Sequence, residues 1–256
     1  MTDAADSADG RHGRRRRGWT AFLRDLVIII LIALAVSWLL KTFLVRSFYI
    51  PSGSMENTLL VNDRIIVNEL VPNVIAVQHG DVVVFKDPGG WLTPTPKVDE
   101  PWIQQAGEWL LSLIGLAAPD SDEHLIKRVI GLPGDTVACC DATGSLTVNG
   151  VPIDEPYILK DGNLDAAPET FSVTVPADSL WVMGDNRYHS ADSLFHIDDP
   201  SGGFLPMDDV VGKALVISYP VNRWTVLDNY PATFAGVEDR SVDGESTDDP
   251  TVSSGG

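Results

Sequence analysis

A long uncharged apolar stretch near the start constrains this chain more than any other feature. Residues 26–40 read LVIIILIALAVSWLL and contain no charged side chain. With the apolar residues that flank them, they approach the ~20 residues that a helix needs to cross a bilayer. Arg24, Asp25 and Lys41 stand near the ends, where their side chains can reach the interface. The sequence therefore predicts a single transmembrane helix over residues 25–45.

Two other interpretations of this stretch deserve comparison. A cleaved signal peptide also has a basic start and an apolar middle, but it ends in a cleavage site made of small residues. The residues that follow here are KTFLVR, 41–46, which offer no such site. A helix buried in a protein core stays open as a third interpretation.

Basic residues precede the apolar stretch. The segment RHGRRRR, residues 11–17, contains five arginines. Because the cytoplasmic flanks of membrane helices are rich in Lys and Arg, we expect residues 1–24 to be a basic cytoplasmic tail. Everything after about Val45 is then expected outside, in a single-pass protein of the cell membrane. A nucleic-acid-binding patch is the weaker interpretation beside a membrane span.

The rest of the chain is strongly acidic. After Asp25 there are 12 Lys and Arg residues against 32 Asp and Glu residues. Such a charge does not suit binding to a phosphate backbone, so nucleic acid is not an expected partner; the acidity instead favours solubility. Residues 236–256 are acidic and rich in Ser, Gly and Thr, which predicts a disordered tail.

Short runs rich in β-branched residues follow the apolar stretch and are typical of β-strands. The segment GSLTVNGVPI, 144–153, predicts a hairpin because Asn149-Gly150 is a type I′ turn signal. The outer part of the chain is therefore expected to be mostly β. The other predicted strands lie in DRIIV (63–67), GDVVVF (80–85), HLIKRVIGLPGDTV (124–137), SVTVP (172–176), LWVMGDN (180–186) and VVGKALVISYP (210–220).

One segment departs from the β pattern. In residues 101–120, apolar side chains recur at helical spacing, and Glu108 is the only charge in the apolar part. Two interpretations stay open: a helix packed on the β core, or an interfacial helix with Trp102 and Trp109 at the level of the lipid headgroups. The sequence thus predicts an inserted loop and amphipathic helix over 88–120.

The two cysteines, Cys139 and Cys140, are adjacent. Neighbouring cysteines rarely form a disulfide, because the bridge strains the peptide between them, so we expect two thiols. The chain has no CxxC motif and no Cys/His spacing typical of zinc sites. No metal or other cofactor is expected.

Two serines flank a glycine in PSGSMENTLL, residues 51–60. Taken alone, this is turn chemistry, and Ser54 would make a good N-cap. A nucleophilic serine would need a base, either a histidine or a lysine made neutral, and no GxSxG motif is present. Lys127 is a candidate, because on a strand it lies between Leu125 and Val129. Burial there would lower its pKa, and adjacent Arg128 would act in the same direction.

Four sequence blocks stand in order behind the apolar stretch, and together they resemble bacterial type I signal peptidase. This family consists of membrane-bound serine proteases that remove signal peptides from exported proteins. The resemblance covers roughly residues 25–225. It implies a mostly antiparallel β catalytic region over 46–235, with a smaller β cap subdomain at about 138–175. The blocks are PSGSMENTLL (51–60), GDVVVF (80–85), KRVIGLPGD (127–135) and GDNRYHSADS (184–193).

The resemblance implies a Ser–Lys dyad, with Ser54 as nucleophile and Lys127 as general base. The Ser52 hydroxyl and the backbone N–H of Ser54 would stabilise the charge that develops on the tetrahedral intermediate. Ser190 would orient the lysine amine. The resemblance gives supporting roles to Asp185, Asp192 and Arg128.

The resemblance also implies the substrate. The family cleaves preproteins after small residues in an Ala-x-Ala pattern, so the expected partners are signal-peptide-bearing preproteins, the lipid bilayer and, nearby, the secretion translocon. Shallow apolar pockets would exclude large side chains, although core packing is the alternative interpretation of each pocket residue. The implied pocket residues are Phe48, Ile50, Pro51, Met55, Leu59, Ile65 and Ile126.

Two positions depart from the family pattern. The family usually has proline two residues after the motif methionine, where this chain has Asn57. The fourth block usually ends in arginine, where this chain has Leu194. Asp192 therefore lacks its usual partner, with Arg128 or Arg187 as candidates, and a low-activity paralogue becomes an alternative.

Three other functions can be compared with this hypothesis. A membrane-tethered β binding module predicts that Ser54→Ala and Lys127→Ala have no effect. A sortase-like Cys/His enzyme would need a Thr-Leu-x-Thr-Cys segment, which is absent. A metal hydrolase built on His189, Asp192 and His196 lacks an HExxH helix.

Overall fold

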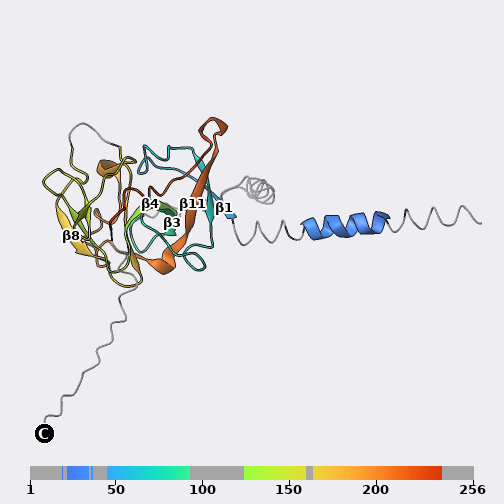
Figure 1. Ribbon diagram of the computed structural model, residues 1–256, viewed down its shortest axis with the longest axis horizontal. Helices are drawn as coiled ribbons and strands as arrows, with labels where there is room; N and C mark the ends of the chain where they lie inside the picture. The colour runs from blue at the N-terminus through green and yellow to red at the C-terminus, as the bar shows by residue number, and fades with distance from the viewer. Residues whose placement is uncertain are drawn as a thin grey trace, which may run out of the picture. The chain divides into compact units, whose positions relative to one another are not determined.

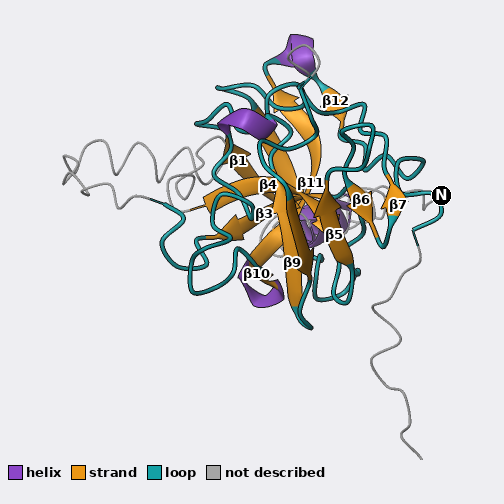
Figure 2. Cartoon of the chain, turned by 90° about the vertical axis from the view of Figure 1, so that its left-hand side faces the viewer, coloured by secondary structure: helices purple, strands orange, loops and turns teal. Residues whose placement is uncertain are grey.

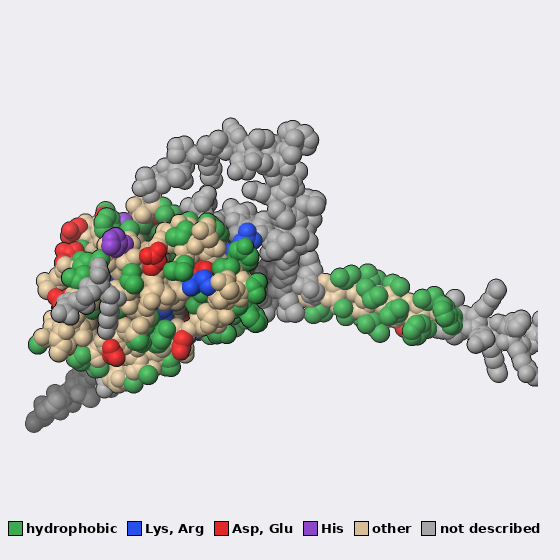
Figure 3. Space-filling view, turned by 90° about the horizontal axis from the view of Figure 1, so that it is seen from above, with side chains coloured by type: hydrophobic (Ala, Val, Ile, Leu, Met, Phe, Trp, Pro, Cys, Tyr) green, Lys and Arg blue, Asp and Glu red, His purple; other side chains and the backbone are tan. Residues whose placement is uncertain are grey.

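The computed structural model describes residues 19, 22–34, 36, 45–92, 124–159 and 164–237. The chain forms two compact units, Met1–Val45 and Arg46–Gly256. In the first unit, residues 22–34 form a helix with exposed apolar side chains (Figure 3). Among the residues described, no helix combines the length and the apolar character that a membrane crossing requires.

Several sequence predictions fall on residues that the structure does not describe. The predicted span over 25–45 includes residues 37–44, which lie outside the described residues. The same holds for the basic segment 11–17, for the predicted helix over 101–120 and for residues 238–256 of the predicted tail.

The second unit contains a large β-sheet with the strand order β1-β2-β11-β3-β4-β9-β10, and β12 pairs with β11. Figure 1 labels four strands of this sheet, β1, β11, β3 and β4. The pairs β2–β11, β11–β3, β3–β4, β4–β9 and β9–β10 are antiparallel. The prediction of a mainly β, antiparallel fold is therefore confirmed. The strands are β1 (Val45–Tyr49), β2 (Arg64–Asn68), β3 (Val82–Lys86), β4 (His124–Gly131), β9 (Ser179–Met183), β10 (Leu205–Pro206), β11 (Val210–Tyr219) and β12 (Thr225–Val226).

A smaller antiparallel sheet has the order β7-β6-β5-β8 and lies beside the large one (Figure 2). The β6–β7 hairpin turns at Asn149 and Gly150, whose φ angles are 53° and 80°. Positive φ at both positions is the type I′ geometry that the sequence predicts. The strands are β5 (Thr136–Cys139), β6 (Thr147–Val148), β7 (Val151–Pro152) and β8 (Phe171–Thr174), and short 3₁₀ turns occur at η2 (Arg187–His189), η3 (Met207–Asp209) and η4 (Val221–Arg223).

Both faces of the large sheet are buried around β3. Val82 and Val84 pack in one core cluster, while Val83 and Phe85 pack in a second cluster on the other face. Successive side chains of a strand point to opposite faces, so a strand covered on both sides reads as an unbroken apolar run, here VVVF at 82–85. The neighbouring strand β4 lies between β3 and β9 and is equally protected from solvent.

The structure corrects the expectation of two free thiols. Cys139 and Cys140 are joined in a disulfide. The peptide bond between them is cis, and their Cα atoms are 3.0 Å apart.

Candidate active site

A serine and a lysine that are 73 residues apart in the sequence meet at the centre of the unit. Lys127 Nζ lies 2.9 Å from Ser54 Oγ and donates a second hydrogen bond to the Ile126 carbonyl at 3.0 Å. The side chain of Lys127 projects from β4, and Ser54 lies in the turn that follows β1. Both residues are buried, with only 2% of Lys127 and 7% of Ser54 exposed.

The turn that carries Ser54 is fixed by its own sequence. Backbone hydrogen bonds join Glu56 N to the Gly53 carbonyl and Leu59 N to the Met55 carbonyl. Met55 and Leu59 are fully buried in the core cluster beneath the turn. The methionine directly after Ser54 therefore anchors the serine over β4.

Burial changes the acid–base chemistry of Lys127. It lowers the pKa of the amine from 10.5 to about 8, against the opposing charges of Asp192 and Asp185, which raise it. Desolvation has this effect because the charged ammonium loses more hydration than the neutral amine. At pH 7 roughly a tenth of Lys127 is therefore neutral and able to accept a proton, compared with less than about a thousandth of an exposed lysine.

A loop after β9 holds the serine turn from the other side. The backbone N–H of Asn186 donates to the Ser54 carbonyl at 3.1 Å, and its side-chain amide donates to the Gly53 carbonyl at 3.2 Å. Gly184 lies so close that a Cβ there would come within 2.5 Å of the Ser54 carbonyl oxygen. The loop needs glycine at this position because any side chain would push the two segments apart.

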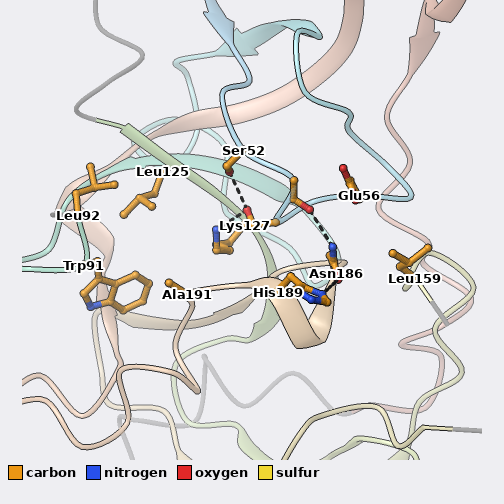
Figure 4. A pocket seen from close by; sticks show the side chains of 12 residues that line it. Ser52, Glu56, Trp91, Leu92, Leu125, Lys127, Leu159, Asn186, His189 and Ala191 are labelled. Atoms are coloured by element: carbon orange, nitrogen blue, oxygen red, sulfur yellow. Dashed lines mark hydrogen bonds between the residues drawn. The ribbon is translucent and has the colours of Figure 1, made fainter. Parts of the chain in front are cut away.

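A cavity of about 590 Å³ opens beside the pair (Figure 4). Ser52 lies at its wall, with its hydroxyl oxygen 3.4 Å from Ser54 Oγ. Within the described residues, no three His, Cys, Asp or Glu side chains are grouped so that they could hold a metal ion. The cavity is lined by Ser52, Gly53, Ser54, Glu56, Trp91, Leu92, Leu125, Lys127, Leu159, Asn186, His189 and Ala191.

Comparison with known proteins identifies the family. The model of the family described as "Signal peptidase, peptidase S26" matches residues 23–219. This chain belongs to the signal peptidase family. A probable signal peptidase I of Mycobacterium leprae (strain TN) is 38% identical over 246 residues, which cover 86% of this chain and 83% of that protein.

Two further proteins have the same name. Signal peptidase I of Mycobacterium tuberculosis (strain CDC 1551 / Oshkosh) is 39% identical over 245 residues, covering 87% of this chain and 81% of that protein. A crystal structure of a signal peptidase I from Enterococcus faecalis V583 is 24% identical, with a TM-score of 0.31, and covers 54% of this chain and 95% of its own. Family membership makes this chain a serine endopeptidase.

The partner of Asp192 in this signal peptidase differs from the expectation. Arg128 pairs with Asp185 and Arg187 pairs with Glu155, so neither arginine binds Asp192. The Asp192 carboxylate instead accepts hydrogen bonds from the backbone N–H groups of Gly184 at 2.8 Å and Leu194 at 3.1 Å. Leu194 packs in a hydrophobic cluster. Backbone amides therefore hold Asp192 where the family usually has an arginine.

Ser190 also departs from its expected contact. Among the residues that the structure describes, its hydroxyl oxygen is buried and has no hydrogen-bond partner. The Lys127 amine donates its second hydrogen bond to the Ile126 carbonyl instead. The backbone of β4 therefore orients the amine here.

The seven residues implied as substrate pocket do not line the cavity. Six of them pack in the core cluster beneath the serine turn, and Pro51 is exposed at the surface. These six are Phe48, Ile50, Met55, Leu59, Ile65 and Ile126.

Asn57 and the cavity wall contain features that the sequence analysis missed. Asn57 has a φ of 84°, which proline cannot adopt, and its amide donates to the Tyr157 carbonyl at 3.2 Å. The turn therefore requires a residue other than proline at this position. The sequence assigns Asn186 no separate role within the block at 184–193, although its polar side chain next to Asp185 is a signal for a contact with the site.

Arg128 and Asp185 form a buried ion pair next to the site. Arg128 binds Asp185 through Nε at 2.9 Å and a terminal nitrogen at 2.7 Å. Its guanidinium also donates to the Gly80 carbonyl at 2.7 Å and lies 4.1 Å from the centre of the Tyr157 ring. Burial by itself would lower the pKa of Arg128, but the charge and hydrogen bonds of Asp185 raise it. Arg128 therefore stays protonated inside the protein.

Asp185→Ala is expected to lower the free energy of unfolding by about 3–5 kcal/mol, because it leaves the buried Arg128 charge without its partner. Chemical denaturation of the full chain in detergent measures this loss. Asp154→Ala, which changes an exposed carboxylate, is the matched control and should stay within about 0.5 kcal/mol of wild type. A loss below about 1 kcal/mol for Asp185→Ala would show that the pair does not support the site.

Proposed function

We propose that this signal peptidase removes signal peptides from exported preproteins, cutting after small residues with Ser54 as nucleophile and neutral Lys127 as general base. The observation that carries the proposal is the buried Nζ–Oγ pair at 2.9 Å beside a cavity large enough for a peptide segment. The lowered pKa of Lys127, about 8, supports the same roles.

The first half of the reaction forms an acyl-enzyme. Ser54 Oγ attacks the scissile carbonyl carbon while its proton passes to Lys127 Nζ, giving a tetrahedral intermediate with a negatively charged oxygen. When this intermediate collapses, the peptide C–N bond breaks and the protonated lysine gives its proton to the leaving amine. The mature protein departs with a free N-terminus, and the signal peptide stays bound as an ester.

The second half releases the signal peptide. A water molecule attacks the ester carbonyl while Lys127 Nζ takes its proton. Collapse of the second tetrahedral intermediate breaks the bond to Ser54 Oγ, which recovers a proton from the lysine. One amine thus serves as base and then as acid in each half, and its pKa near the working pH favours both roles.

Ser52→Ala is expected to lower kcat by about 10²-fold with little change in KM. The Ser52 hydroxyl adjoins Ser54 Oγ at 3.4 Å, and in the proposal it donates to the oxyanion, which exists only in the transition state and intermediate. Steady-state kinetics on a peptide substrate measures kcat and KM separately. Ser172→Ala, an exposed serine on β8, is the control. An unchanged kcat for Ser52→Ala would contradict an oxyanion role.

The proposal includes a membrane anchor. The uncharged residues 26–40 would span the bilayer, with the basic segment 11–17 in the cytoplasm and the catalytic unit outside, near the secretion translocon. The helix over 22–34 and its exposed apolar side chains support this arrangement. Anchoring raises the effective concentration of enzyme around signal peptides in the same membrane.

A cleavage assay with a defined preprotein tests the function. The full chain in detergent is incubated with a preprotein whose signal peptide ends in Ala-x-Ala, and the product N-terminus is sequenced. We expect the product to begin directly after the last alanine, and we expect at least about a hundredfold slower cleavage when that alanine is replaced by phenylalanine. Failure to cut the Ala-x-Ala preprotein would contradict the proposal.

A further inference from the structure

The cavity beside Ser54 has two chemically different halves. In Figure 4, Trp91, Leu92, Leu125 and Ala191 lie on one side of Lys127, and Glu56, Asn186, His189 and Leu159 lie on the other. The first group contains only apolar side chains, and we call it the apolar half. Trp91 is its largest member and lies at its far end from Leu125.

The Trp91 indole is held rigidly in place. It stacks on the His196 ring at 4.6 Å with an interplanar angle of 8°, and its edge meets Phe85 at 5.8 Å and 89°. His196 is itself fixed by Asp199, at 2.7 Å from Nδ1. Only 6% of Trp91 is exposed. An indole packed on two rings behaves as a wall and not as a mobile lid.

The backbone before Trp91 is equally constrained. The Asp87 carboxylate accepts hydrogen bonds from four consecutive backbone N–H groups, those of Gly89, Gly90, Trp91 and Leu92. Gly89 and Gly90 have φ angles of 124° and 95°, which side chains other than glycine rarely tolerate. The segment Asp87–Leu92 therefore has one defined shape, which presents Trp91 and Leu92 to the cavity.

We propose that Trp91 is a specificity-determining residue that closes the apolar half and limits the size of the substrate side chain seated between it and Leu125. The inference deepens the proposed function and rests on it. The apolar half receives the signal-peptide side of the cleavage site, whose residues are apolar and small. The other half, which contains Glu56, Asn186 and His189, receives the start of the mature protein. A rigid indole excludes a bulky side chain because neither His196 nor Phe85 leaves it room to retreat.

Peptide substrates test this inference. The parent peptide has alanine at each of the last five positions before the scissile bond, and each position in turn is changed to leucine or phenylalanine. For Trp91→Ala we expect kcat/KM for a bulky side chain at one position to rise about tenfold or more over wild type. Trp91→Phe should show a smaller gain in kcat/KM at the same position, and each gain is expressed relative to the parent peptide cleaved by the same variant.

Leu159→Ala is the matched control, because Leu159 lines the other half of the same cavity. Leu159→Ala should not raise kcat/KM for a bulky side chain at the position where Trp91→Ala raises it. If neither Trp91 variant raises kcat/KM for a bulky side chain at any position, another residue sets the size limit and the inference is wrong. Should Trp91→Ala fail to fold, as judged by its melting temperature, the result for Trp91→Phe decides.

A binding measurement separates this inference from the proposed function. The same peptides are titrated calorimetrically against Ser54→Ala and against Ser54→Ala combined with Trp91→Phe. We expect the bulky peptide to gain affinity in the double variant, whether or not the wild-type chain cleaves the parent. No gain in affinity overturns the role of Trp91, whereas an uncleaved parent peptide overturns only the proposed cleavage.

Discussion

Ser54→Ala is expected to abolish preprotein cleavage, lowering kcat by at least about 10⁴-fold. The variant removes the oxygen that would form the acyl-enzyme, and serine proteases that lose their nucleophile keep only the small rate that binding and the oxyanion site provide. The fold should survive, because Met55 and Leu59 still anchor the turn. Quantitative mass spectrometry of the released mature protein measures the residual rate.

Ser172→Ala provides the control, since it removes an exposed hydroxyl from β8. It should cleave at the wild-type rate. If Ser54→Ala kept more than about a tenth of wild-type activity, another group would have to be the nucleophile, since covalent catalysis cannot proceed without one. A fully active variant would instead agree with a tethered binding module and a contaminating protease.

Lys127→Met is the second variant with a large expected effect, also a loss of at least about 10⁴-fold in kcat. Methionine fills a similar volume but cannot accept the serine proton. Lys127→Arg should be equally inactive, because a guanidinium stays protonated and has no acceptor site. Lys86→Met, which changes an exposed lysine at the end of β3, should retain wild-type activity. An active Lys127→Arg variant would contradict proton transfer to residue 127.

Lys127→Met should also have a larger free energy of unfolding than wild type at pH 7. The pKa of Lys127 is lowered from 10.5 to about 8 on folding, which corresponds to a penalty of up to about 3 kcal/mol for the protonated form. Below pH 8 the folded protein bears this penalty in full. Between pH 8 and 10.5 the unfolded chain binds the extra proton, so wild-type stability rises with pH and the advantage of Lys127→Met disappears. Chemical denaturation of both proteins at pH 7 and pH 10.5 measures this difference in the free energy of unfolding. A Lys127→Met variant less stable than wild type at pH 7 would contradict the penalty.

The β architecture was predictable because its signals are local. Runs rich in β-branched residues predict β3 and β11, and Asn149-Gly150 predicts the β6–β7 turn from its φ preferences alone. The pairing of β11 with both β2 and β3 was not predictable. It joins segments more than a hundred residues apart and depends on how the two core clusters pack.

The meeting of Ser54 and Lys127 was predicted from the sequence blocks, whereas the support around them was not. Arg128 and Arg187 were the candidate partners of Asp192, because Leu194 stands where the family usually has an arginine. Backbone amides bind Asp192 instead, and no side-chain pattern reveals amide orientation. The disulfide of Cys139 and Cys140 was not expected, because adjacent cysteines rarely form one. Trp91 reads as part of a connecting loop until Asp87 and His196 fix its position.

The pH dependence of kcat/KM tests the central claim most directly, because this ratio reports the ionisation of the free enzyme. It is measured on the full chain in detergent, with a peptide substrate that has no ionisable group near the cleavage site. The account predicts that kcat/KM rises with pH through a single inflection near 8, where Lys127 loses its proton. A profile that is flat between pH 6 and 10, or that inflects only between 6 and 7 as for a histidine base, would contradict it.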